Sequence, residues 1–279
     1  KKINRGIDSI EKSIAFHNLV ISHNKDLTPR QTEAMADARV YIYGHESPSE
    51  KSSGHRILSP MALELADKKL VEFSDLDVID PAYKPEEHSD YWKSLGNEEF
   101  SLDDFISWLH ENKSEFSQTI SDRSRNIAFW QWAKENVPLD IADGLNDLPV
   151  LLTSGSMVAV SETVYLSDAY LKDGGIEAIV RQYQTDARFI SPEYLGDGGE
   201  KRTIEEWAEF WTHVGVMSEI LDILENTVIP NLANIENEEL PATFARYRSK
   251  LEDRLGSLPE KLKDLRVKGR DGRFRPISE

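Results

Sequence analysis

The chain contains no cysteine among its 279 residues. Disulfide bonds and thiolate metal sites are therefore excluded. No apolar run approaches the roughly 20 residues of a membrane-spanning helix. The residues from Lys1 onward show no secretory signal pattern, and the first residue is not Met. These absences predict a cytoplasmic protein without a membrane partner, and they fit a processed or excised piece of a longer chain.

Positive charge is also scarce. The chain carries 33 Lys and Arg against 50 Asp and Glu, for a net charge of −17. Such a field repels DNA and RNA unless basic residues are segregated into a patch. Hydrophobic residues make up 39% of the chain, with 6 Trp, 9 Tyr and 10 Phe, which is enough for real cores. The composition predicts a globular protein of one large or two ordinary domains.

Motifs of catalysis and nucleotide binding are missing as well. The Asp-Gly-Gly runs at 173–175 and 197–199 lack the neighbouring Lys-Ser/Thr of a phosphate-binding loop, and they indicate turns. The Ser154-Gly155-Ser156 run lacks the Gly-x-Ser-x-Gly pattern of a nucleophile elbow. We therefore assign no catalytic residue, no metal ligand and no cofactor.

Periodicity and capping signals predict many short elements. Asp8 with Glu11, and Thr28 with Pro29 and Gln31, indicate helix starts. Helices are expected over 8–24, 28–38, 61–69, 101–113, 124–137, 174–184, 203–215, 217–234 (with a break near Pro230) and 241–256. Strands are expected over 38–43, 55–60, 76–85 and 187–196, and hairpins over 149–162 and 264–279.

The sequence repeats itself. Residues 147–162 align without a gap on residues 264–279, and six of sixteen positions are identical. Val78–Tyr83 ("VIDPAY") matches Phe189–Tyr194 ("FISPEY") at Ile, Pro and Tyr. Two capped helices with aromatics in step follow these segments, at 101–109 and 203–211.

The repeat predicts an α+β fold made of duplicated modules, since its period exceeds 100 residues. We expect a first module over 1–120, a second over 121–239 and the start of a third over 240–279. Glu279 aligns with Glu162, which 117 further residues follow, so the chain is expected to be a fragment that ends inside the third copy.

Three segments resemble, in this order, the middle of large proteins with a sacsin-type N-terminal ATPase domain, including NO VEIN-like proteins. The segments are "LPVLLTSGSMVAVSETVYLSDAYL", "FISPEYL" and "EEWAEFWTHVGV". The resemblance covers residues 145–216. It implies long α/β repeats behind a GHKL-class ATPase, and several bacterial relatives are associated with phage defence. The ATPase motifs themselves, an acidic-Asn helix and an Asp-x-Gly site, do not occur here, so no catalytic residue carries over.

Two kinds of cluster, one of histidines and one of paired acids, have both a functional and a structural interpretation. His45-Glu46 with His55 could hold a metal if the ligands converged, but a solvated loop is the simpler interpretation. Asp103-Asp104 and Glu205-Glu206 could be catalytic pairs, but each pair is expected to begin a helix, where acids suit the positive end of the dipole.

Five tryptophans lie at helical spacings, and core packing is expected for them, with an exposed recognition platform as the alternative. They are Trp108, Trp130, Trp132, Trp207 and Trp211.

Basic residues gather at the C-terminus, with seven between Lys261 and Arg275. Lys268, Arg270, Arg273 and Arg275, on a hairpin with Phe274, are candidates for contact with nucleic acid or a protein partner. An ordinary exposed hairpin, or one covered by another module, is the structural alternative.

We therefore expect a non-catalytic coupling or scaffold segment of a larger cytoplasmic ATPase protein. Its partners would be other domains of that protein or a separate protein. A nucleic-acid-binding segment of a defence protein is the alternative, and a metal-dependent enzyme comes third.

Overall fold

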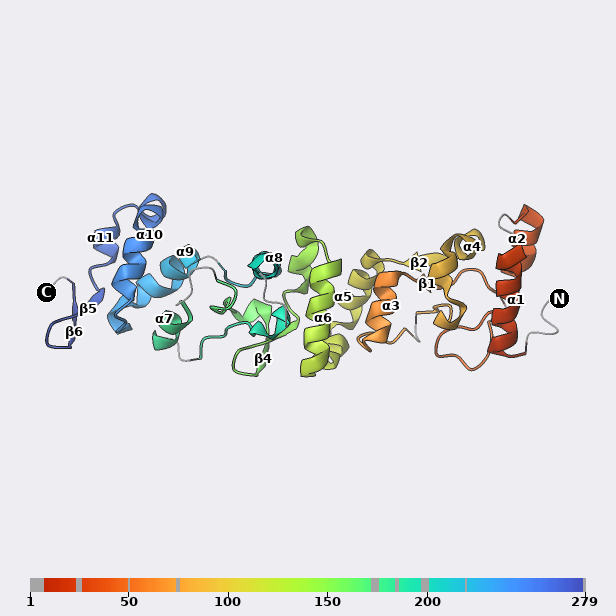
Figure 1. Ribbon diagram of the computed structural model, residues 1–279, viewed down its shortest axis with the longest axis horizontal. Helices are drawn as coiled ribbons and strands as arrows, with labels where there is room; N and C mark the ends of the chain where they lie inside the picture. Colours follow the sequence, from red (N-terminus) through yellow and green to blue (C-terminus); the bar gives the residue numbers. More distant parts are fainter. Residues whose placement is uncertain are drawn as a thin grey trace. The chain divides into compact units, whose positions relative to one another are not determined.

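The structure is a computed structural model, and it describes residues 8–23, 27–49, 51–73, 76–171, 176–183, 186–196, 201–218 and 220–277. Both Asp-Gly-Gly runs and the last two residues lie outside this part. The chain divides into two compact units, residues 1–132 and 133–279, and the division falls within helix α6 (Figure 1). Throughout the described segments, no helix has the length and apolar character that crossing a membrane requires.

Helices alternate with small two-stranded sheets, so the chain is α+β as expected. The elements of the first unit are α1 (Ile10–His23), α2 (Pro29–Ala36), β1 (Arg56–Leu58), α3 (Pro60–Asp67), η2 (Pro81–Tyr83), η3 (Pro85–His88), α4 (Ser89–Ser94), β2 (Glu98–Phe100), α5 (Leu102–Thr119) and α6 (Arg123–Asn136). Those of the second unit are η4 (Leu139–Leu145), β3 (Pro149–Leu151), β4 (Met157–Ala159), η5 (Val160–Glu162), α7 (Ile176–Tyr183), η6 (Pro192–Leu195), α8 (Lys201–Val214), α9 (Ile220–Ile223), η7 (Leu224–Val228), η8 (Ile229–Asn234), α10 (Leu240–Leu255), α11 (Leu258–Lys261), β5 (Arg266–Lys268) and β6 (Phe274–Pro276).

Side-chain caps fix several helix starts. Thr28 and Gln31 form the expected capping box of α2, with Pro29 as its first residue. Ser101 and Asp104 do the same for α5. The prediction that Asp8 caps the first helix is wrong. Helix α1 begins at Ile10, and the hydroxyl of Ser9 accepts from the N–H of Lys12.

The structure differs from the expected elements in several places. Residues 38–43 form only isolated bridges, at Val40 and Ile42, instead of a continuous strand. Residues 217–234 are broken well before Pro230, because α9 passes directly into the π-helix η7 and then into η8. Strand β2 was not expected at all; it pairs in parallel with β1, from Arg56 opposite Glu98 to Leu58 opposite Phe100.

The two hairpins have the same geometry. Strands β5 and β6 lie 117 residues after β3 and β4, and their registers match, with Pro149 opposite Ala159 and Arg266 opposite Pro276. Each turn has a glycine at the same place with positive φ, +83° at Gly155 and +78° at Gly272. Only glycine adopts this conformation without strain, which explains its recurrence in the turn.

The two strand-Pro-x-Tyr segments also make matching backbone contacts. Tyr43 N–H donates to Val78 O at 2.8 Å, and Asp80 N–H donates to Tyr41 O at 3.1 Å. The tyrosine that ends the segment contacts the stretch from Tyr41 to Tyr43 as well, since Tyr83 Oη accepts from Tyr41 N–H at 3.0 Å.

In the second unit the pattern recurs about 110 residues later. Thr153 N–H donates to Phe189 O at 2.8 Å, and Ser191 N–H donates to Leu151 O at 2.9 Å. Tyr194 Oη accepts from Leu151 N–H at 2.6 Å. We call each set of three bonds a tyrosine frame. Such matched contacts are what an internal duplication predicts, while the module boundaries stay a prediction.

Each unit has its own core. In the first unit, His17 of α1 contacts the rings of Tyr83, Tyr91 and Trp92, with ring centroids 4.9–6.0 Å apart. This cluster ties α1 to the first tyrosine frame. The buried members of the second core include Tyr165, Ile179, Val180, Phe189, Ile223, Leu224, Val228, Leu232, Ile235, Leu240, Phe244, Leu251 and Leu265.

Candidate functional site

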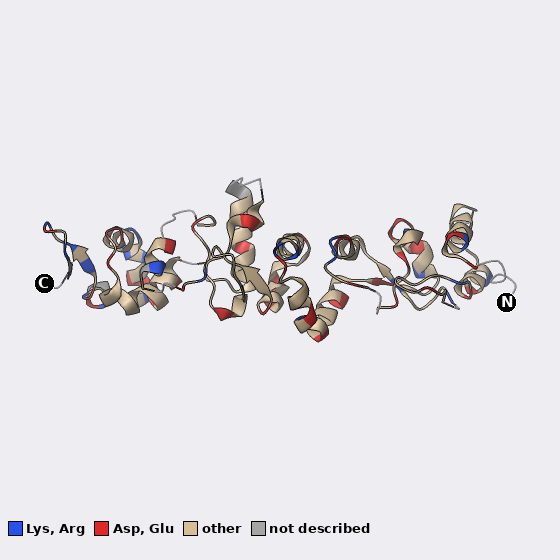
Figure 2. Cartoon of the chain, turned by 90° about the horizontal axis from the view of Figure 1, so that it is seen from below, with Lys and Arg blue, Asp and Glu red and all other residues tan. Residues whose placement is uncertain are grey.

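The basic hairpin β5–β6 is the surface that the sequence singles out. Figure 2 shows blue, Lys and Arg, along the hairpin beside the C-terminus. Leu265, at its base, is buried and donates its N–H to Leu262 O, as Leu148 does to Leu145 O in the earlier hairpin. The basic side chains themselves extend from a hairpin whose base is anchored in the second unit.

Acidic residues already neutralise part of this charge. Arg266 pairs with Glu236 at 2.7 Å, and Lys268 pairs with Glu238. Arg275 pairs with Asp271 of its own turn at 2.5 Å. Of the four predicted contact residues, Lys268 and Arg275 are therefore engaged within the chain.

The other two predicted contact residues are Arg270 and Arg273. Both are exposed, and neither makes an ion pair with any residue in the described part of the chain. The structure thus places all four predicted residues on one hairpin and leaves two of the guanidinium groups at the turn available to a partner.

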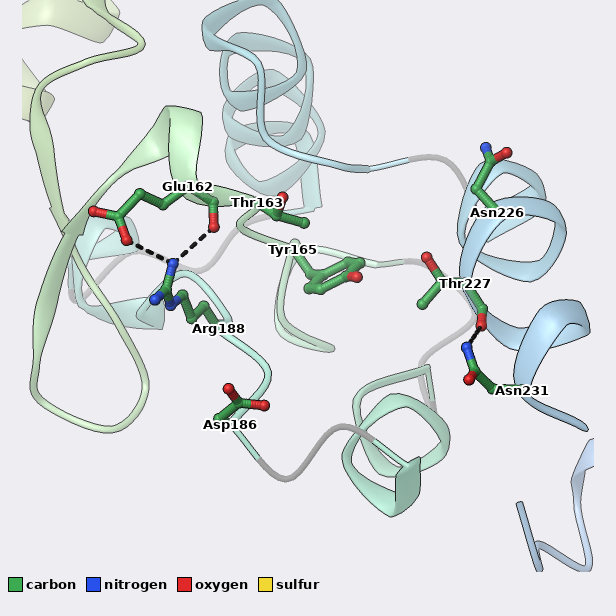
Figure 3. A pocket seen from close by; sticks show the side chains of 8 residues that line it. All are labelled: Glu162, Thr163, Tyr165, Asp186, Arg188, Asn226, Thr227 and Asn231. Carbon is green, nitrogen blue, oxygen red and sulfur yellow. Dashed lines mark hydrogen bonds and ion pairs between the residues drawn. The ribbon is translucent and has the colours of Figure 1, made fainter. Parts of the chain in front are cut away.

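A second candidate is a polar hollow of about 420 Å³ in the second unit, which the sequence did not predict. Figure 3 shows Glu162, Thr163 and Tyr165 after the β3–β4 hairpin, and Asp186 and Arg188 just before Phe189. The opposite wall consists of Asn226, Thr227 and Asn231 from η7 and η8.

Hydrogen bonds fix both walls of this hollow. Arg188 Nη1 donates to the backbone O and to the carboxylate of Glu162, both at 2.8 Å. Asn231 Nδ2 donates to Thr227 O at 2.8 Å. Because Arg188 is already paired with Glu162, the hollow offers a ligand mainly hydroxyl, amide and carboxylate groups. Such groups can bind a polar molecule, but the geometry shows no nucleophile with an adjacent base.

Backbone strain accompanies this hollow. Thr163 has φ +58°, in the left-handed region that non-glycine residues avoid. The opposite wall contains a π-helix, a form that is frequent at functional sites. No signal in the sequence could have indicated the hollow, because its residues come from three segments separated by loops and share no motif.

A larger hollow of about 870 Å³ lies in the first unit. Trp108, Asn112 and Phe116 of α5 line it together with the stretch from Lys69 to Glu72. Helix α5 is kinked there, since Asn112 has φ −110° and ψ 17° and its side chain donates to Trp108 O at 2.9 Å. A half-buried Trp beside a kink offers an apolar wall, and the rest of the lining includes the charged residues Lys69, Glu72, Glu111, Glu115 and Arg125.

The histidine cluster does not assemble. His45 and Glu46 are exposed, whereas His55 is buried, with Nδ1 2.9 Å from Asp77 Oδ2 and Nε2 2.9 Å from Lys51 O. Within the described ranges, no group of three His, Asp or Glu side chains is arranged to hold a metal ion.

The first acid pair has the expected structural role. Asp104 Oδ2 accepts from the N–H and the hydroxyl of Ser101, at 2.9 and 2.8 Å, and Arg56 lies 3.2 Å from Oδ1. Burial opposes ionisation, but the Ser101 hydrogen bonds and the charge of Arg56 outweigh it and lower the pKa of Asp104.

The expectation for the second acid pair is wrong in its position. Helix α8 begins at Lys201, so Glu205 and Glu206 lie in its second turn rather than at its start. Glu206 accepts from Lys134 Nζ at 3.0 Å. The pair is therefore part of a helix surface with a local ion pair.

The tryptophans pack in cores, as expected. Trp130, Trp132 and Trp211 are fully buried and Trp207 is 4% exposed, whereas Trp108 is half-buried. The face formed by Trp207 and Trp211 packs on Tyr194, with ring centroids 6.0 and 5.1 Å away. The four buried tryptophans, which are Trp130, Trp132, Trp207 and Trp211, therefore cannot form an exposed recognition platform.

No family model, no curated protein and no solved structure matches the chain. The function is therefore inferred from the geometry of the molecule and from the resemblance of residues 145–216.

Proposed function

We propose that this chain is a non-catalytic scaffold segment, which couples domains or binds a protein partner. The observation that carries the proposal is the recurrence of the tyrosine frame. Tyr83 and Tyr194 accept from the backbone N–H groups of Tyr41 and Leu151 in the same way, and their rings belong to the cores. Side chains that could suggest chemistry, such as Asp104 and His55, have structural bonds instead.

The wider setting of the scaffold comes from the resemblance. Residues 145–216 support a place in a larger GHKL-type ATPase protein of the sacsin-type or NO VEIN-like group, with a role in phage defence. The absence of cysteine supports a cytoplasmic location. In that setting the segment couples domains or binds a protein partner, and another domain hydrolyses ATP.

An activity assay tests the scaffold function. The purified chain is incubated with Mg²⁺ or Mn²⁺, labelled ATP and a plasmid, and we expect no turnover above a mock preparation. Turnover that disappears in Asp186→Asn, which alters the one carboxylate of the polar hollow outside the Glu162–Arg188 pair, would overturn the non-catalytic function. Asp222→Asn is the matched control, because Asp222 lies outside that hollow and pairs with Arg254.

A nucleic-acid-binding segment is the second candidate, and the exposure of Arg270 and Arg273 is the observation that favours it. Binding of this kind weakens steeply with salt, because phosphate contacts release counterions. If it occurs, Arg270→Glu with Arg273→Glu abolishes it, whereas Lys12→Glu with Lys84→Glu, at exposed sites in the first unit, does not. Equal loss in both double variants would assign the binding to charge in general.

A further inference from the structure

The polar hollow of the second unit is lined by side chains that the fold leaves unused. Hydrogen bonds engage only Glu162, Arg188 and Asn231 among its eight lining residues. The other five side chains make no hydrogen bond or ion pair with another residue in the described part of the chain: Thr163, Tyr165, Asp186, Asn226 and Thr227. Three hydroxyls, one amide and one carboxylate therefore remain for a ligand.

Tyr165, at the centre of this hollow, has an equivalent in the first unit. Tyr165 N–H donates to Arg188 O at 2.8 Å, and Arg56 N–H donates to Asp77 O at 3.1 Å. Tyr165 and Arg56 each also form two parallel bridges, one of them to the strand-Pro-x-Tyr segment of the same unit. The backbone thus places Arg56 and Tyr165 at matching positions.

The side chains at these two positions differ. Arg56 pairs with Asp104 at 3.2 Å and with Glu98 at 3.4 Å, so the first unit uses its polar groups there internally. Tyr165 is buried but lines the hollow, and Figure 3 shows its hydroxyl between the two walls, on the side of Thr227. The exchange of an ion-paired arginine for a tyrosine therefore leaves polar groups available in the second unit alone.

Charge narrows the class of ligand. The hollow has two carboxylates, on Glu162 and Asp186, against one guanidinium, on Arg188, which already donates to Glu162. An anionic ligand would therefore meet a lining that is negative overall. A metal ion is not favoured, since within the described ranges no three His, Asp or Glu side chains converge. An apolar ligand is not favoured either, because none of the eight lining residues is aliphatic.

We propose that the polar hollow binds a small neutral polyhydroxy compound, of the class of monosaccharides and cyclic polyols. The hydroxyls of such a ligand both donate and accept, as the hydroxyls of Thr163, Tyr165 and Thr227 do, and the carboxylate of Asp186 accepts from them. The volume of about 420 Å³ lies in the range of small-molecule sites. This inference goes beyond the scaffold function and does not depend on it.

Saturation-transfer difference NMR on the full chain tests the inference. D-Glucose, D-galactose, D-mannose and myo-inositol are titrated one at a time. We expect saturable binding of at least one of them, with a dissociation constant of about 10 mM or below. No saturation by any of the four would overturn the inference. Binding confined to adenine, citrate or spermidine would also overturn it, because these probes represent a flat base, an anion and a cation.

Variants assign the binding to the hollow. Asp186→Asn removes the charged acceptor and should weaken binding about tenfold. Thr227→Val keeps the shape of the side chain without its hydroxyl and should weaken binding about threefold or more. Asp222→Asn and Thr243→Val are the matched controls, because both residues lie outside the hollow, and they should leave binding unchanged. Circular dichroism confirms that each variant is folded.

Equal binding by all four variants and the parent would place the compound on another surface and overturn the inference. Equal loss in the hollow and control variants would do the same. The scaffold function fails separately, since turnover of ATP or plasmid would overturn it and leave these titrations unaffected. Absence of binding in a chain without turnover would overturn the hollow as a ligand site alone.

Discussion

The hydroxyl of Tyr194 accepts a hydrogen bond from the backbone N–H of Leu151, 43 residues earlier, at 2.6 Å. Tyr83 makes the equivalent bond with Tyr41, 42 residues earlier, at 3.0 Å. Burial raises the pKa of both tyrosines. Both hydroxyls therefore stay protonated and neutral, and each completes the tyrosine frame of its unit.

Replacing Tyr194 with Phe tests the strength of this bond. The ring still fills its site, but the buried N–H of Leu151 loses its acceptor. We expect the free energy of unfolding to fall by about 1–3 kcal/mol, measured by urea denaturation. Tyr83→Phe should act similarly in the first unit. Tyr43→Phe is the control, because Tyr43 is 36% exposed, and it should change stability by less than about 0.5 kcal/mol.

Trp211 tests the packing on the second frame. Its side chain is fully buried and contacts Tyr194, Trp207 and Phe210. Trp211→Ala should lower the free energy of unfolding by about 3–5 kcal/mol, since it leaves a large cavity. Leu139→Ala, at a 36% exposed residue, should cost far less. A loss below about 0.5 kcal/mol for Trp211→Ala would contradict the observed burial.

His17 predicts a pH dependence of stability. A carbonyl can only accept, so Nε2 donates to Arg39 O at 3.3 Å and Nδ1 accepts from Tyr91 Oη at 2.8 Å. Burial lowers the pKa of His17 to about 4 from its ordinary 6.5, although the Arg39 bond opposes the shift. The unfolded chain therefore binds the proton first, and stability is lost as pH falls from 6.5 toward 4.

The measurement compares unfolding at pH 7 and pH 5 in the parent and in His17→Gln. At 1.36 kcal/mol per pH unit, His17 accounts for about 2 kcal/mol of the loss over this interval. The variant should show a smaller loss by that amount, whatever its absolute stability. Identical pH profiles would show that His17 is not held neutral by the fold.

The hairpin turns give a further test. Gly155 and Gly272 have positive φ, and no atom lies within 4 Å of a Cβ placed at either residue. Alanine there suffers only from the backbone conformation, so each substitution should cost about 1 kcal/mol. Gly144→Ala is the control, because Gly144 has equal space and no positive φ; it should be neutral or slightly stabilising in thermal unfolding.

Local signals in the sequence predicted much of the fold. Thr28 with Gln31 predicted one helix start, because a capping box depends on residues only three apart. The helix that begins after Ser101 was also expected, although its capping box with Asp104 was not. Ser154-Gly155 predicted the β3–β4 turn. Tyr83 and Tyr194 were matched by sequence alone, and the structure gives them equivalent hydrogen bonds.

Features that depend on distant pairing were not predictable. The parallel pairing of β1 with β2 joins Arg56 to Glu98 across several intervening elements, and short strands have little periodicity of their own. The basic hairpin was predicted from composition, but the ion pairs that engage Lys268 and Arg266 come from Glu238 and Glu236 in the preceding segment. Only the folded chain shows which charges remain available.

The spacing within each tyrosine frame has a consequence for protein synthesis. A ribosome makes Leu151 43 residues before Tyr194, and Tyr41 42 residues before Tyr83. Translation proceeds at about 5–20 residues per second, so the stretches around Leu151 and Tyr41 are made some seconds before the tyrosine that bonds to them. During that interval these stretches are open to other nascent strands. Capture by the segment of its own module is favoured because a tethered partner has a high effective concentration.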